Sequence, residues 1–167
     1  MNQKNSLMVK NLAIDGVMAA LLFLMGLFKI PAFLPGTEFQ ISAPYAVAIA
    51  KNRGFAKYLL IGIAASIVGF CLGLQNIYHV ITAMIYRVVV GAIIAVFPDS
   101  RVAAVVSGPC GSFVSRVVLG LILHTSIGTL LLFAAPGMMF TAITAPIITK
   151  LMEKLLGQLS LNRTAAR

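Results

Sequence analysis

The sequence is poor in charged residues. Asp, Glu, Lys and Arg make up 10% of its 167 residues, whereas hydrophobic residues make up 60%. A water-soluble fold of this size would lack the polar side chains needed to cover its surface. This composition, with a mean hydropathy of +1.00, therefore predicts an integral membrane protein. At about 20 apolar residues per spanning helix, the chain has room for roughly six short helices and for no soluble catalytic domain.

Motifs that would carry chemistry are also missing. No G-x-x-x-x-G-K-[ST] loop occurs, so this chain supplies no ATPase. It lacks H-E-x-x-H, paired carboxylates, and a serine or cysteine beside a base, which disfavours a membrane-embedded enzyme. Cys71 and Cys110 lie within apolar runs and are expected to act as small hydrophobes, so neither a disulfide nor a metal site is predicted. The absence of tryptophan argues against extensive stacking on a ligand.

Acidic residues are scarce, and the formal net charge is +9. In a soluble protein this excess would suggest nucleic-acid binding, but here the basic residues fall mostly in loops, where orientation in the membrane explains them better. We therefore expect no nucleic-acid partner. No A-x-A cleavage site follows the first apolar run, so the first helix is expected to remain in the mature protein.

The hydrophobic runs predict an all-α, single-domain bundle of six transmembrane helices over residues 1–167. The run at 42–51 is too short to span a bilayer unless the preceding TEFQI segment contributes. The six predicted helices lie at about 11–30, 42–51, 57–74, 78–97, 102–123 and 127–152.

The segments predicted on the two sides of the membrane differ sharply in positive charge. With the N-terminus inside, the outer loops hold only Lys29, and the positive-inside rule then places both termini in the cytoplasm. The cytoplasmic segments hold Lys4, Lys10, Lys51, Arg53, Lys57, Arg101, Lys150, Lys154, Arg163 and Arg167.

Two arginines, Arg87 and Arg116, stand inside apolar helices. At 1.5 Å per residue, Arg87 lies roughly 12 Å below the outer surface and Arg116 roughly 22 Å from the inner one, so both fall in the outer half of the membrane. Buried charge is costly and usually marks a binding site or pathway, and arginine suits a carboxylate or phosphate. Alternatively, each arginine pairs with a backbone carbonyl or caps a helix, or Arg116 extends to the interface.

Other polar side chains are predicted at the same depth. They include amides and rings that could line a cavity open to the outside, although rings are common at membrane boundaries in any case. The predicted substrate-binding set is Arg87, Arg116, Asn76, Tyr78, His79, His124 and Tyr45.

The first helix carries two features of its own. In the segment GVMAA, Gly16 and Ala20 stack on one face, and with Ala19 they form a small-residue strip on which another helix could pack closely. Asp15 is the acid within a predicted helix. It could complement the helix dipole, pair with Lys10 or with a neighbouring subunit, or couple transport to protons.

Together these features resemble the substrate-binding S component of the energy-coupling factor (ECF) transporters for vitamins and related micronutrients. The resemblance covers nearly the whole chain. It rests on the six-helix size, the cytoplasmic termini, the basic loop after the second helix, the outer segment IPAFLPGTEFQISAP, and the strip GVMAA, which is similar to the family's AxxxA motif with glycine in first place.

The resemblance implies a division of labour. The vitamin would bind among the outer parts of helices four to six, with Arg87 and Arg116 as anchors and Glu38, Phe39, Gln40 and Ile41 as the lid. Gly16, Ala19 and Ala20 would dock on a transmembrane T component. Two cytoplasmic ATPases would use ATP and Mg²⁺, and this chain would itself carry no cofactor.

The sequence leaves the ligand and one rival open. Two arginines favour an anionic micronutrient such as folate, biotin, pantothenate, niacin or lipoate, while cobalamin, a pyridoxine or a thiamine precursor stays possible. The rival is a self-contained ion-coupled carrier or channel in the cell membrane, with Asp15 as its coupling group.

Overall fold

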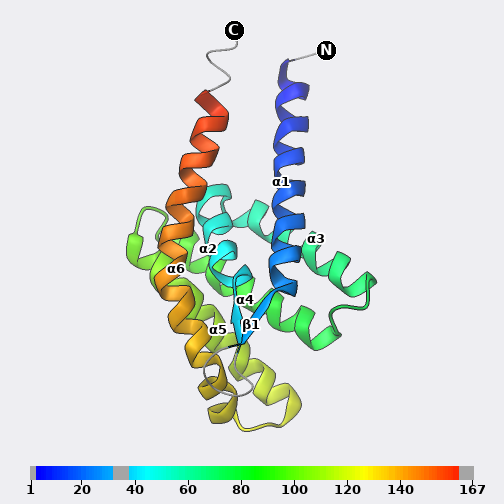
Figure 1. Cartoon of the computed structure of the whole chain (residues 1–167), viewed down its shortest axis with the longest axis vertical. Helices are drawn as coiled ribbons and strands as arrows, with labels where there is room; N and C mark the ends of the chain where they lie inside the picture. The colour runs from blue at the N-terminus through cyan, green and yellow to red at the C-terminus, as the bar shows by residue number, and fades with distance from the viewer. Residues whose placement is uncertain (1–2, 32–37, 162–167) are drawn as a thin grey trace.

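The computed structural model describes residues 3–31 and 38–161, although the side chains of a few residues near the ends of these ranges are not described. Over these ranges the chain forms six helices, as predicted, and a short antiparallel hairpin (Figure 1). The helices are α1 (Gln3–Leu27), α2 (Ser42–Arg53), α3 (Phe55–Cys71), α4 (Ile77–Val96), α5 (Arg101–Leu123) and α6 (Ile127–Leu161). The strands are β1 (Lys29–Pro31) and β2 (Glu38–Gln40).

Four helices in the described ranges are long and apolar enough to cross a membrane, namely α1, α4, α5 and α6. The helix α3 is apolar but shorter, with 17 residues, and α2 has only 12. Many large apolar side chains on the long helices are exposed, including Leu12, Phe113 and Ile143. An exposed apolar surface of this extent suits a lipid environment, so the fold is that expected of a multi-pass membrane protein.

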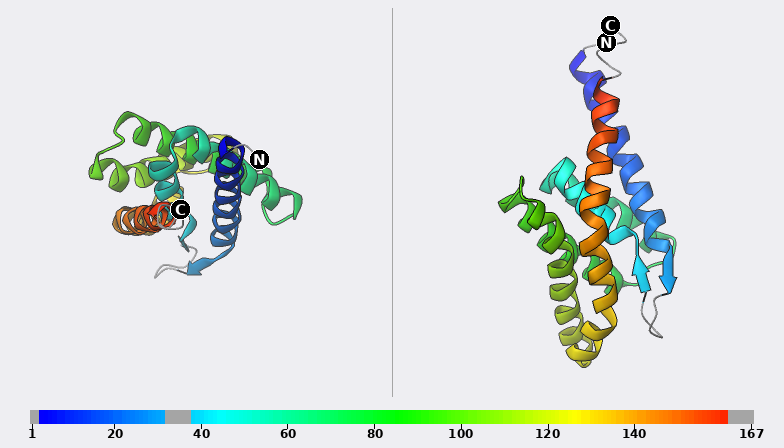
Figure 2. Two further views of the ribbon diagram at one scale, coloured as in Figure 1. Left: turned by 90° about the horizontal axis from the view of Figure 1, so that it is seen from above. Right: turned by 60° about the vertical axis from the view of Figure 1, so that its left-hand side comes forward.

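The bundle has two distinct ends. The start of α1 and the end of α6 lie at one of them, which we call the terminal end (Figures 1 and 2). The β1–β2 hairpin and the turn between α5 and α6 lie towards the other, which we call the hairpin end (Figure 1).

The short helix α2 lies at the centre of the bundle. Residues Pro44–Ala50 are all buried, and the core around them includes Met18, Tyr58, Val90 and Ala145 from four other helices. A helix of 12 residues is about 18 Å long, whereas the apolar part of a bilayer is about 30 Å thick. The central helix therefore fills only part of the bundle's depth.

Several predicted helix boundaries are wrong, and the third helix ends at Cys71 rather than near 74. The first helix begins at Gln3 and ends at Leu27, and Lys29–Pro31 pairs with Glu38–Gln40 in place of the helical end predicted at 30. Ile30 lies opposite Phe39 in this hairpin. The sixth helix continues to Leu161 rather than ending near 152. The hairpin forms through backbone hydrogen bonds between two short segments. The sequence signal here was only an apolar run that stops at a proline, and this does not indicate such pairing.

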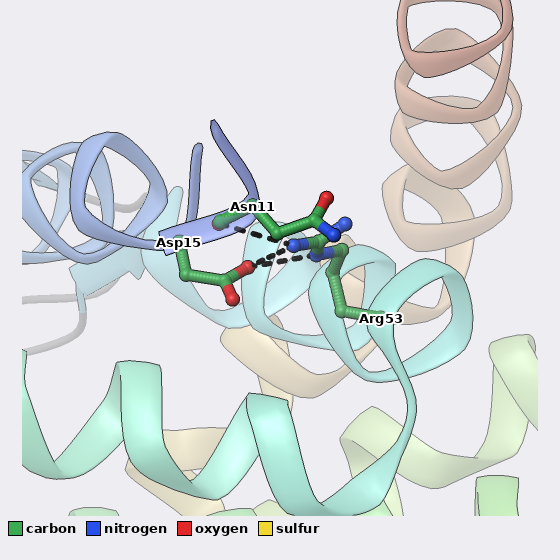
Figure 3. Close-up of polar contacts among 3 residues, drawn as sticks. All are labelled: Asn11, Asp15 and Arg53. Atoms are coloured by element: carbon green, nitrogen blue, oxygen red, sulfur yellow. Dashed lines mark hydrogen bonds and ion pairs between the residues drawn. The ribbon is translucent and has the colours of Figure 1, made fainter. Parts of the chain in front are cut away.

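Three consecutive residues at the end of α2 form hydrogen bonds and an ion pair with other parts of the chain at the terminal end. Lys51 Nζ donates to the Ser100 carbonyl, 3.1 Å away, and Asn52 Nδ2 donates to the Thr149 carbonyl of α6 at 3.3 Å. Arg53 pairs with Asp15 of α1, with 2.8 Å between Nε and Oδ1 (Figure 3). One turn of α2 thus fixes α1, α6 and the start of α5.

This arrangement corrects two readings of Asp15. Because α1 begins at Gln3, Asp15 lies well inside the helix and not in its first turn, where it would complement the dipole. Its partner is Arg53, whose Nη2 also reaches the Asn11 carbonyl at 3.4 Å, rather than Lys10.

Candidate functional site

A cavity of about 790 Å³ opens within the bundle towards the hairpin end, with walls from all six helices and Gln40 of β2. Its size falls within the usual range of small-molecule sites. It brings together five of the seven residues that the sequence predicted for substrate binding: Arg87, Arg116, Asn76, Tyr78 and His79.

The cavity lies over the start of α2. Ser42, Ala43 and Ala46 line it, so the cavity lies beyond the first turn of the short central helix. Helix N-termini carry partial positive charge because their first backbone N–H groups have no acceptor within the helix. This end of α2 therefore adds to the positive potential from Arg87 and Arg116.

Arg87 is the most buried charged residue of the cavity wall, with 8% of its surface exposed. Its Nη1 atom donates to Ser66 Oγ at 2.7 Å and lies 3.4 Å from Met84 Sδ. Both of these partners are neutral. Among the side chains that the structure describes, no carboxylate forms an ion pair with Arg87. Arg87 is therefore a buried cation whose charge is not neutralised by these neighbours.

The start of α4 forms the more open side of the cavity. Asn76 caps this helix, because its Oδ1 accepts from the backbone N–H of His79 at 2.9 Å. Asn76, Tyr78 and His79 are exposed, whereas Arg87 is buried more than two turns further along the helix. The cavity therefore has an exposed polar rim at the start of α4 and a buried cation, Arg87, deeper inside.

Two predicted binding residues do not reach the cavity. Tyr45 is 7% exposed and belongs to the buried core around α2 rather than to the cavity wall. His124 adopts a left-handed backbone conformation (φ 50°) that ends α5, which leaves its side chain exposed on the turn.

The predicted lid coincides with β2. Gln40 lines the cavity, whereas Ile41 is half-buried in the turn before α2 and does not line it. Glu38 and Phe39 belong to the strand, but their side chains lie outside the described part of the structure. The backbone therefore places this segment beside the cavity, as a lid would require.

Sequence reasoning missed several polar residues of the wall. The clearest is Tyr86, whose hydroxyl donates to the Ala43 carbonyl at 3.1 Å and so joins α4 to the first turn of α2. Glycines on α5 leave room for its ring, since a Cβ on Gly111 would lie 2.9 Å from Tyr86 Cδ2. The adjacency of Tyr86 to Arg87 was the only available signal. The other missed residues include Ser42, Thr82, Ser112, Ser115 and Thr141.

The predicted docking strip lies on the outer face of α1. Gly16 and Ala20 are exposed, and a Cβ added to Gly16 would meet no atom within 4 Å. Ala19 is half-buried and packs against the core instead. The strip is therefore accessible from outside the bundle at Gly16 and Ala20.

One relative with a curated description resembles most of the chain. It is protein BioX of Lysinibacillus sphaericus, which is 44% identical over 142 residues, covering 85% of this chain and 86% of the relative. Identity at this level over this length shows common descent and a shared fold. The chain belongs to the BioX family. No family model and no solved structure matches it.

Proposed function

We propose that this BioX-family protein is the substrate-binding S component of an ECF-type vitamin importer. One observation carries the proposal: a vitamin-sized cavity is lined by a buried arginine with neutral neighbours. A buried charge of this kind is costly, and a ligand carboxylate would offset that cost through a charge-assisted hydrogen bond. The chain acts as a binding subunit and not as an enzyme.

We further propose that all six helices contribute to the membrane domain, with both termini in the cytoplasm. The terminal end then carries Lys51, Arg53 and Arg101, in agreement with the positive-inside rule. The hairpin end faces outwards, so the cavity collects its ligand from outside the cell. The hairpin, with Gln40 at the cavity wall, closes over the bound ligand.

The ligand we propose is biotin or a close relative with a free carboxylate. Biotin was among the anionic candidates from the sequence, and the name of the relative, BioX, suggests a biotin-related role. The cavity offers two arginines for the carboxylate, together with amide, hydroxyl and imidazole groups for a polar ring. Aromatic contact comes from Tyr78, Tyr86 and Phe133 rather than from tryptophan.

Transport requires partners in this proposal. The exposed strip at Gly16 and Ala20 docks on a transmembrane T component, and two ATPases supply the energy with ATP and Mg²⁺. The open space around Gly16 and the small side chain of Ala20 support close packing of a second helix. Lipid covers the remaining apolar faces.

The ion-coupled carrier is less well supported. Its coupling group would be Asp15, but this carboxylate is engaged by Arg53 at the terminal end. Asp15 is thus held in an ion pair that links α1 to α2, whereas a coupling group would have to be free to bind the transported ion.

Three experiments test the proposal. Native mass spectrometry of the purified chain should show a small molecule of vitamin size, and titration calorimetry should show tight binding of biotin. In liposomes, the chain alone should not concentrate labelled biotin under a proton or sodium gradient, whereas co-reconstitution with the T component and ATPases should do so when ATP is present. Concentrative uptake by the chain alone would contradict the S-component role and favour the carrier.

A further inference from the structure

Arg87 does not extend freely into the cavity but rests on the neighbouring helix α3. A Cβ added to Gly62 would overlap with Arg87 Cδ and Nε and would lie 3.0 Å from Cζ. The absence of a side chain at this position is therefore what lets the arginine lie against the backbone of α3. One turn further along, Ser66 accepts the hydrogen bond from Nη1.

Gly62 and Ser66 form a cradle on one face of α3, because residues four apart in a helix lie above one another. Both are buried, and Ser66 is only 3% exposed. Ser66 and Met84, which contact Nη1, line a separate apolar groove between α3 and α4, whereas Arg87 lines the cavity. The contacts that hold Nη1 thus come from residues outside the cavity wall.

The chemistry of the cradle is as important as its shape. A guanidinium group is planar and has five N–H donors, so fixing one nitrogen sets the plane of the others. Serine fixes that nitrogen with a neutral oxygen, which leaves the positive charge in place. An acidic residue at position 66 would hold the arginine equally well but would neutralise it.

We infer that Gly62 and Ser66 are positioning residues that orient the Arg87 guanidinium and thereby set the preference of the cavity for a carboxylate ligand. The inference rests on the proposed function in taking Arg87 as the ligand anchor. It adds that the selectivity depends on two residues of α3 that do not line the cavity.

The test compares biotin with biotinamide, which lacks the negative charge. For the full chain in detergent, we expect Ser66→Ala to lower the preference for biotin over biotinamide about tenfold, because one hydrogen bond to a charged group is lost. Ser66→Thr keeps the hydroxyl and should retain the preference within about threefold. Gly62→Ala should lower it as well, since Arg87 must move. In an Arg87→Met background, Ser66→Ala should have no further effect.

A second readout needs no ligand. Phenylglyoxal modifies accessible arginines, and its rate at Arg87 is measured by peptide mass spectrometry. We expect Ser66→Ala to raise this rate relative to both the wild-type chain and Ser66→Thr. If Ser66→Ala raises the modification rate but the wild-type chain does not bind biotin, the proposed function is contradicted. The role of Ser66 in positioning Arg87 then still stands. An unchanged preference and an unchanged rate in Ser66→Ala, or equal losses in Ser66→Ala and Ser66→Thr, would overturn the cradle.

Discussion

Arg53 at the terminal end and Arg87 beside the cavity are two cations held inside one helical bundle by different partners. Arg53 is paired with Asp15, and their side chains are 12% and 20% exposed. Arg87 is held by Ser66 and by the sulfur of Met84, neither of which carries charge. Pairing within the chain makes an arginine part of the structure, whereas neutral partners leave it able to attract an anion.

The two ends of α2 show the same contrast. Its last turn is fully engaged, because Lys51, Asn52 and Arg53 each bind a different part of the chain. Its first turn borders the cavity, where Tyr86 contacts the Ala43 carbonyl. The last turn of α2 is thus bonded to other helices at the terminal end, whereas its first turn borders the cavity. Substitutions at the terminal end should change stability, and substitutions at the cavity should change ligand binding.

The largest effect is expected from Arg87→Met, which keeps an unbranched side chain and removes the charge. Losing a buried charged partner should weaken biotin binding by about 2–5 kcal/mol, or roughly 30-fold to several thousand-fold. Titration calorimetry measures this loss, with Arg101→Met as the control because Arg101 is exposed at the start of α5. Unchanged affinity in Arg87→Met would remove the anchor from the account.

The second-largest effect is expected from Arg53→Met, which should lower the stability of the protein. This change leaves Asp15 without its partner in a poorly solvated position, so we expect the protein to lose about 1–3 kcal/mol while biotin affinity stays within about threefold. The double variant Asp15→Leu with Arg53→Met should recover most of the loss, because no charge is then left unpaired. Thermal unfolding in detergent measures both, and a double variant as unstable as the single one would argue against the ion pair.

A smaller effect is expected from Tyr86→Phe. The ring remains between α4 and α5, but the hydrogen bond to the Ala43 carbonyl is lost, at a cost of about 0.5–1.5 kcal/mol in stability. Biotin affinity should fall by less than about tenfold, since the positive charges stay in place. A loss of binding as large as that of Arg87→Met would mean that the hydroxyl, and not the charge, is the main anchor.

The smallest effect on the isolated chain is expected from Gly16→Leu. A side chain at this position meets open space, so both the unfolding temperature and biotin affinity should match the wild-type values. Assembly should nevertheless fail, because leucine prevents close approach of a second helix. Co-purification with the T component measures this, and Val17→Leu on the same exposed stretch is the matched control. Retained assembly would remove the docking role.

The sequence was sufficient for the number of helices, for the two arginines of the cavity wall and for its exposed polar rim. Apolar runs mark helices directly, and the depth of Arg87, Asn76 and His79 follows from counting residues along α4. The placement of Tyr45 could not be obtained in this way. It depends on which face of a fully buried helix points to the cavity, and a helix that is apolar all round gives no such signal.

The partners of the arginines were also beyond the reach of the sequence. Arg87 and Ser66, and likewise Arg53 and Asp15, are far apart along the chain and meet only because their helices pack together. The shortness of the central helix was visible from the start. Its consequence, a cavity over Ser42, required the packing of the other five helices.

The central claim is that Arg53 is a structural cation paired with Asp15, whereas Arg87 has neutral partners and is available to a ligand. Its most direct test is to compare the thermal unfolding of Arg87→Met, Arg53→Met and the wild-type chain without any ligand. Removing an uncompensated buried charge relieves a desolvation cost, whereas breaking an ion pair creates one. We predict that Arg87→Met unfolds at the wild-type temperature or above and that Arg53→Met unfolds below it. An Arg87→Met variant destabilised as much as Arg53→Met would contradict the account, because Arg87 would then be a structural cation like Arg53.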